Sequence, residues 1–156
     1  MEFKPIFSDL QACCQVVTEE MQQLAGTREI KLTVVGQITP FEIDTNLLRR
    51  ALLNLLSNAV KYSPEGSIIE FTVSSDIEQI VLCIQDRGIG IPEEEQCRLF
   101  EVFHRAKNVG NVSGTGLGLA IVNLAVEAHG GTITIESQVN VGTAVTISIP
   151  VSRHEI

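Results

Sequence analysis

The sequence predicts an α+β fold, a sandwich in which one sheet lies under helices. Its 156 residues are 44% hydrophobic, which is enough to bury the core of one compact domain. Patterns with the period of a helix and of a strand are mixed along the chain, without the strict alternation of βαβ units. The sequence contains no internal repeat and no sign of a second domain. We therefore expect one domain over residues 1–151 and a tail over residues 152–156.

Three segments have the spacing of full helices. The first ends at Gly26, the second starts from a cap at Asp44 or Thr45, and the third ends near His129, where Gly130 is a natural C′ residue. The first helix is expected at 7–25, and the second runs to Lys61. The third follows a run of glycines at 114–119, and a further short acidic helix is expected at 93–103. The apolar face of the first comprises Phe7, Leu10, Cys14, Val17, Met21 and Leu24.

Strand-like runs fill most of the remaining chain. Residues 1–6 predict a short strand or arm, and a turn near Asp76–Glu78 separates two of the later strands. The last two runs are expected to pair as a hairpin. The expected strands cover residues 29–36, 41–44, 67–75, 79–86, 131–138 and 142–151.

Charge and cysteine content exclude several classes of function. The net charge of −8 argues against nucleic-acid binding and against docking on anionic lipid. No apolar run approaches the length of a membrane span, and no signal peptide opens the chain. We expect a cytoplasmic protein. Whether a longer parent protein carries a membrane anchor stays an open question. Cys13, Cys14, Cys83 and Cys97 have no CxxC spacing, so we expect reduced, partly buried thiols and no cysteine metal site.

Polar residues form a stripe on the leucine-rich second helix. Arg50, Asn54, Asn58 and Lys61 follow one another at intervals that place them on one side. The amide oxygens of asparagine are hard, neutral ligands that could hold Mg²⁺ beside phosphate oxygens, and Lys61 could meet a phosphate. Taken alone, the stripe is better explained as a solvated face whose asparagines bond to loops.

A D-x-G-x-G motif ends the strand at 79–86. Asp86 could accept a hydrogen bond from an exocyclic amine such as that of adenine. Gly88 and Gly90 would let the backbone turn sharply and approach a ligand. The alternative is a plain turn in which Asp86 caps its own backbone.

An irregular segment and a glycine run complete the candidate site. Arg105 and Lys107 open a stretch of small residues that suits a phosphate lid, although a disordered connector is the alternative. The run "GTGLGL", residues 114–119, opens the third helix. Glycines at a helix N-terminus let phosphate oxygens reach the free N–H groups, which explains their presence, while a flexible hinge is the plain alternative. The spacing fits neither the Rossmann nor the P-loop motif.

Taken together, these motifs resemble a known family. "NLLSNAVKYS" (54–63), "DRGIG" (86–90), "LFEVFHR" (99–105) and "GTGLGLAIV" (114–122) are similar, in order and spacing, to the N, G1, F and G2 boxes of the catalytic and ATP-binding domain of sensor histidine kinases, the signalling enzymes of two-component systems. The resemblance runs from about residue 3 to 150. It implies a Bergerat-type (GHKL) ATP-binding fold, a two-layer sandwich with a mixed sheet of about five strands under three helices.

The resemblance also implies roles for single residues. Asn58 and Asn54 would ligate Mg²⁺, Lys61 would face phosphate, and Tyr62 would lie near adenine. Asp86 would take the adenine amine, and Arg105 would meet the γ-phosphate. Asn58, Lys61 and Arg105 would be the catalytic set. The further nucleotide-binding residues would be Gly88, Gly90, Ile91, Lys107, Gly114, Thr115, Gly116, Leu117, Gly118 and Leu119.

Histidine kinases of this kind phosphorylate a histidine on a separate dimerising helical hairpin, for relay to a response regulator. His104, His129 and His154 do not match the acceptor motif, so we expect a monomeric domain that binds Mg-ATP but does not phosphorylate itself. It would be part of a larger kinase or half of a split system. The alternatives are a gyrase, Hsp90 or MutL-type ATPase, an anti-sigma-factor serine kinase, or a non-catalytic module that binds nucleotide structurally. In those ATPases a glutamate activates water where this chain has Asn54.

Overall fold

The computed structural model describes residues 3–90 and 117–151. The elements form where the sequence pattern predicted them, except that the first strand and the start of the first helix are shifted. The short helix expected at 93–103 lies outside the described residues, together with the tail. The helices are α1 (Leu10–Leu24), α2 (Thr45–Tyr62) and α4 (Leu117–Ala128). The strands are β1 (Ile6–Ser8), β2 (Glu29–Val35), β3 (Phe41–Ile43), β4 (Ile68–Ser75), β5 (Gln79–Asp86), β6 (Thr132–Gln138) and β7 (Gly142–Pro150).

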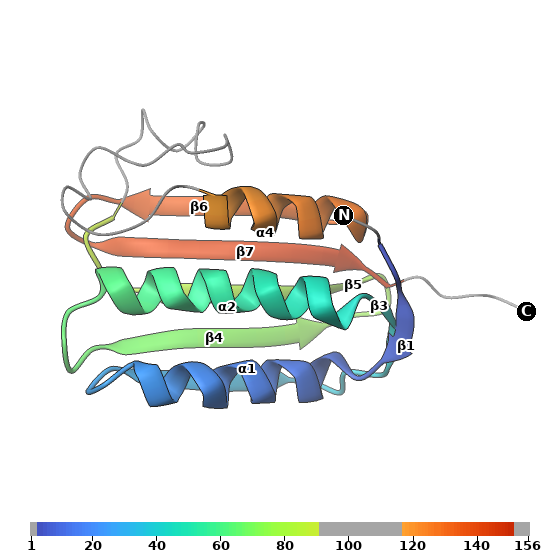
Figure 1. Cartoon of the computed structure of the whole chain (residues 1–156), viewed down its shortest axis with the longest axis horizontal. Coiled ribbons are helices and arrows are strands. Elements are labelled where there is room, and N and C mark those ends of the chain that lie inside the picture. The colour runs from blue at the N-terminus through green and yellow to red at the C-terminus, as the bar shows by residue number, and fades with distance from the viewer. Residues whose placement is uncertain (1–2, 91–116, 152–156) are drawn as a thin grey trace, which may run out of the picture.

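The main sheet has five strands in the order β2-β4-β5-β7-β6. β2 runs parallel to β4, and the other neighbouring strands are antiparallel, so the sheet is mixed. Helices α1, α2 and α4 all cover the same face of this sheet (Figure 1). The predicted sandwich of a mixed five-stranded sheet under three helices is therefore confirmed. The predicted hairpin of the last two strands is also formed.

The core lies between the sheet and the helices because the strands alternate. Ile80, Leu82 and Ile84 of β5 are buried, whereas the residues between them are half-buried and Gln85 is exposed. Leu52 of α2 is among the largest fully buried side chains that meet them. Burying one such side chain stabilises the fold by roughly 1.5–3 kcal/mol. This alternation fixes which face of each strand meets the helices.

The first helix is shorter than its periodicity predicted. Asp9 caps it, with its Oδ1 accepting the N–H of Ala12 at 3.2 Å, and the helix begins at Leu10. Phe7 belongs instead to β1, where it is paired with Glu42 of β3 and is 70% exposed. Leu24 is 74% exposed because the chain turns after it and Ala25 packs into the core in its place. The prediction that these two residues share the buried face was wrong.

Two strands lie apart from the main sheet. β1 and β3 form an antiparallel pair of their own, with Ile6 opposite Ile43. The strand expected within residues 1–6 is thus displaced toward the first helix and begins only at Ile6. In Figure 1 this pair stands at the end of the sandwich where α2 begins.

The caps of the two remaining helices are set by Asp44 and Gly130. The Oδ1 atom of Asp44 accepts the N–H of Leu47 at 3.1 Å, which settles the choice between Asp44 and Thr45 as the cap of α2. Gly130, with a φ of +70°, follows α4 as the predicted C′ residue. Within the described part of the chain, none of the helices is both long and apolar enough to cross a membrane.

Candidate functional site

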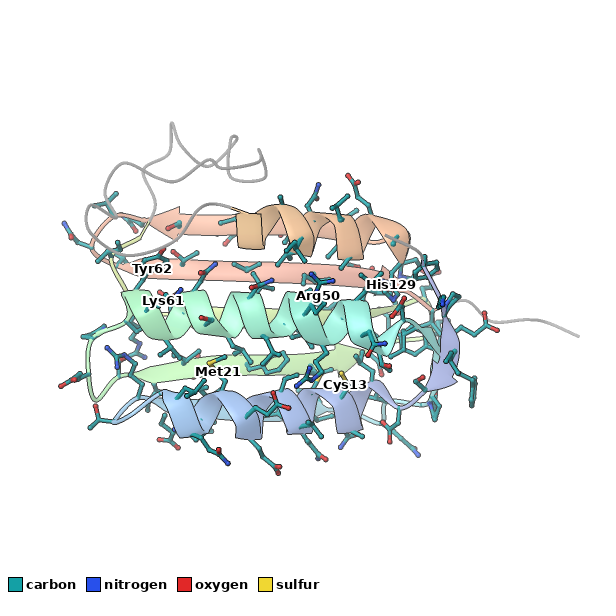
Figure 2. All side chains as sticks on the ribbon, in the orientation of Figure 1. Cys13, Met21, Arg50, Lys61, Tyr62 and His129 are labelled. Carbon is teal, nitrogen blue, oxygen red and sulfur yellow. The ribbon has the colours of Figure 1, made fainter. Side chains whose placement is uncertain are left out.

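One edge of α2 carries the polar residues that the sequence singled out. Asn54, Asn58 and Tyr62 are half-buried, while Arg50 and Lys61 are exposed. Figure 2 shows Arg50, Lys61 and Tyr62 along the side of α2 that faces α4, the helix against which α2 packs. The two asparagine amides lie one turn apart on this flank. They can therefore present neutral oxygens to a cation without leaving the helix.

Asp86 stands at the end of β5, at the edge of the core. Its Oδ1 accepts the N–H of Gly88 at 2.8 Å, and the backbone N–H of Thr143 comes from the paired strand β7. Burial raises the pKa of Asp86, and these two backbone donors offset part of that rise. The carboxylate does cap its own turn, which is the alternative that the sequence left open for Asp86. A carboxylate has about four acceptor positions, so the turn does not prevent it from also accepting an amine.

The loop after Asp86 lies against the C-terminal end of α2. A Cβ atom placed on Gly88 would come closer than 3.0 Å to the carbonyl oxygen of Tyr62, a separation that real side chains do not show. Only glycine permits this approach. Gly88 therefore brings the Asp86 carboxylate and the polar edge of α2 to the same end of the molecule.

The N-terminus of α4 lies at that same end (Figure 1). The helix begins at Leu117, so Leu117, Gly118 and Leu119 form its first turn, where backbone N–H groups have no partner inside the helix. A helix does follow the glycine run, as predicted. The other predicted nucleotide-binding residues lie outside the described part of the chain: Ile91, Arg105, Lys107, Gly114, Thr115 and Gly116.

The turn between β6 and β7 is a part of the site that the sequence analysis missed. Asn140 donates its backbone N–H to the carbonyl oxygen of Ile89 at 2.9 Å. In the sequence, "VNVG" (139–142) indicates only a hairpin turn. Its contact with the Asp86 loop depends on two segments about fifty residues apart, and no local pattern signals it.

A pocket of about 420 Å³ opens beside this turn. Its walls come from within residues 85–87 and 136–144, on β5, β6 and β7. No wall comes from α2, so this pocket is separate from the flank where Asn54 and Asn58 lie.

The cysteines of the described residues are free thiols. Burial raises the pKa of Cys13, and the nearby Arg49 guanidinium lowers it in part. Burial, helped by Cys13 and Asp9, raises the pKa of Cys14 to about 12. Since the thiolate is the reactive form, burial keeps Cys14 inert at neutral pH. Cys97 lies outside the described residues.

Comparison with known proteins identifies the family to which this chain is similar. Residues 43–153 match the family described as histidine kinase-, DNA gyrase B-, and HSP90-like ATPase. The chain is 39% identical over 125 residues to the heme sensor protein HssS of Staphylococcus saprophyticus, covering 79% of this chain and 27% of HssS. It is 38% identical over 118 residues to the sensor histidine kinase WalK of Bacillus subtilis, covering 73% of this chain and 19% of WalK.

Solved structures agree with the sequence relatives. A mycobacterial sensor histidine kinase, MprB, superimposes with a TM-score of 0.82 at 33% identity, over 95% of this chain and 98% of that one. Full-length ShkA in complex with AMPPNP has a TM-score of 0.82 at 27% identity, over 100% of this chain and 33% of ShkA. The chain thus spans well under half the length of the curated relatives named above.

The family model alone does not separate kinases from gyrase-type ATPases, because its description covers both. The sequence relatives and solved structures named above include sensor histidine kinases, and the gyrase or Hsp90 alternative is not favoured. The chain therefore belongs to the histidine kinase-, DNA gyrase B- and HSP90-like ATPase family, and is an ATP-binding domain homologous to those of sensor histidine kinases.

Proposed function

We propose that this chain binds Mg-ATP and donates the γ-phosphoryl group to a histidine on a separate dimerisation and phosphoacceptor domain. One observation carries the proposal. The close approach of Gly88 to Tyr62 brings the Asp86 carboxylate and the asparagine edge of α2 to one end of the molecule, where the first turn of α4 also lies. The proposed adenine acceptor, metal ligands and phosphate donors would thus lie where one nucleotide could meet all of them.

Each described residue of the site has a role that its chemistry suits. Asp86 would accept the exocyclic amine of adenine, which guanine lacks at that position. Asn54 and Asn58 would hold Mg²⁺ through their amide oxygens, and Lys61, exposed at the end of α2, would meet phosphate. When bound, the metal ion would neutralise negative charge on the phosphates.

The first turn of α4 would bind phosphate oxygens through the backbone N–H groups of Gly118 and its neighbours. Arg105 is proposed to pair with the γ-phosphate, and Ile91, Lys107, Gly114, Thr115 and Gly116 to complete the nucleotide site. These assignments rest on their motifs in the sequence.

Transfer to water is disfavoured by the chemistry of residue 54. An amide cannot take a proton from an attacking water as a carboxylate can, and Asn54 occupies the position where the related ATPases carry a glutamate. Phosphoryl transfer depends mainly on positioning and on charge stabilisation, so the acceptor has to be delivered in line with the bound nucleotide. We propose that the acceptor domain of the same kinase does this, and that a response regulator then receives the phosphoryl group.

The proposal is tested by mixing the chain with the acceptor domain of its own kinase and radiolabelled ATP. Label should appear on the acceptor histidine, at a rate that rises with acceptor concentration. An acceptor domain with that histidine changed to alanine is the control and should stay unlabelled. Stable labelling of the 156-residue chain by itself would overturn the proposal.

A further inference from the structure

The turn between β6 and β7 packs on the loop that follows Asp86, backbone against backbone. The N–H of Asn140 donates to the carbonyl oxygen of Ile89 at 2.9 Å. A Cβ atom on Gly142 would come closer than 3.0 Å to the carbonyl oxygen of Asp86, and one on Gly90 equally close to that of Gln138. No side chain separates the two segments at these points.

The turn reaches the loop because its backbone adopts an unusual conformation. Asn140 has a φ of +66° and Gly142 a φ of +145°. Asparagine enters the left-handed region more easily than most residues, whereas a φ near +145° is open essentially to glycine alone. The loop side has the same property, since Gly90 has a φ of +73°. Both partners are thus shaped by residues that accept a positive φ.

Because backbone meets backbone at these contacts, a shift of the turn displaces the loop after Asp86 as well. Packed backbone atoms have no side-chain rotamer that could absorb a shift, and interiors at this density are nearly incompressible. Asp86 is in contact with this turn at a second point, because Thr143, the residue after Gly142, is paired with Asp86 between β7 and β5. The position of that carboxylate is therefore set from the β7 side as well as by Gly88.

We propose that Asn140 and Gly142 are positioning residues for nucleotide binding: they hold the Asp86 loop where its carboxylate can meet the adenine ring. This inference rests on the proposed role of Asp86. Both residues would act through Asp86 without touching the nucleotide themselves.

The test compares two glycine-to-alanine variants by calorimetry with Mg-ATP. Gly142→Ala should weaken ATP binding at least about tenfold, because the added methyl group displaces the Asp86 loop. The matched control is Gly36→Ala. Gly36 has a φ of +82°, but a Cβ there would meet nothing within 4 Å. It also follows β2 at the end of the sheet opposite Asp86. Gly36→Ala should lower the melting temperature yet bind ATP like the parent.

A double-mutant cycle separates positioning from a general loss of structure. If Gly142 acts through Asp86, the double variant Gly142→Ala, Asp86→Asn should bind ATP about as weakly as Asp86→Asn alone. Independent effects would multiply the two losses, and that outcome would overturn the inference. So would an unchanged ATP affinity of Gly142→Ala.

Hydrogen exchange on the parent chain keeps the inference testable if Gly142→Ala does not fold. Mg-ATP should slow exchange at the N–H of Asn140 as well as at that of Gly88, because the turn and the loop move as one unit. Unchanged exchange at Asn140, with protection at Gly88, would contradict the inference and leave the proposed function standing. A parent chain that binds no ATP would instead refute the proposed function.

Discussion

The Nε2 atom of His129 accepts the backbone N–H of Asp44 at 3.0 Å. Its Nδ1 lies 2.7 Å from the carbonyl oxygen of Ala125. The bond joins the end of α4 to the start of α2. The carboxylate of Asp44 also accepts the N–H of Lys4 at 2.9 Å, and Phe3 meets the imidazole edge to face. One partly buried junction thus ties the N-terminal arm to α2 and α4.

Loss of the Asp44 carboxylate should destabilise the fold. Asp44→Ala removes the cap of α2 and leaves the N–H groups of Lys4 and Leu47 without their acceptor. We expect a loss of about 2 kcal/mol in the free energy of unfolding, measured with urea. Asp9→Ala, which removes an exposed cap on α1, is the control and should cost about 1 kcal/mol. Equal losses would show that the junction adds nothing to the cap.

The contribution of Asp44 should disappear in acid. Burial raises the pKa of Asp44, but the N–H groups of Lys4, Leu47 and Asn46 outweigh this effect and hold that pKa below its usual value. A carboxyl group with a lowered pKa in the folded state stabilises the fold above its unfolded pKa, about 3.9, and loses this effect as the pH falls through the folded value. The difference in unfolding free energy between the parent and Asp44→Ala should therefore be constant above about pH 5 and shrink below about pH 4. A difference that grows in acid would contradict this assignment.

Asp86→Asn should weaken ATP binding. A hydrogen bond to a charged group contributes about 1.5–3 kcal/mol, so the dissociation constant should rise by a factor of ten or more. GTP should bind poorly to the parent, because guanine offers a carbonyl oxygen where adenine offers an amine. Calorimetry with both nucleotides measures this. Asp76→Asn, in the exposed turn before β5, is the control and should bind ATP like the parent. Equal affinity of the parent for ATP and GTP would refute the role given to Asp86.

Asn58→Ala should abolish Mg²⁺-dependent phosphoryl transfer and leave the fold intact. The side chain is half-buried on the polar edge of α2, outside the leucine core, so its loss removes a metal ligand and little packing. Transfer assays across a range of Mg²⁺ concentrations, with circular dichroism on the same samples, measure both effects. Asn46→Ala makes the same change at an exposed position on the same helix and should retain transfer. If Asn58→Ala transfers at the parent rate, Asn58 is not a ligand.

Ser63→Ala should leave the stability unchanged or raise it. The Ser63 hydroxyl is buried and, within the described residues, has no hydrogen-bond partner. Removing a buried, unpaired hydroxyl removes its desolvation cost, which is about 1–3 kcal/mol. Ser67→Ala is the control, because the Ser67 hydroxyl donates to the carbonyl oxygen of Pro64 at 2.6 Å and its loss should be destabilising. Thermal unfolding of both variants gives the comparison, and a clearly lower melting temperature for Ser63→Ala would contradict the expectation.

The sequence by itself determined the helices and strands and most of what each buries. Ile80, Leu82 and Ile84 alternate with polar or less buried positions, and such a period can be seen in one short segment. The asparagine edge of α2 was equally visible, because residues four apart share a side of a helix. The family could be recognised for a similar reason, since each of its motifs is a short continuous run.

Only the tertiary structure decided the features that depend on distant segments. Phe7 fits the apolar period of α1, yet it pairs with Glu42 in a strand. The helix starts only after its N-cap, Asp9, so Phe7 lies before it. The contact of Gly142 with the carbonyl oxygen of Asp86 joins residues that no local pattern relates. Periodicity and propensity act over a few residues, whereas close backbone packing is decided by whichever segment the folded chain brings alongside. The residues that align the proposed adenine acceptor are therefore found in a turn whose sequence predicted nothing more than a hairpin.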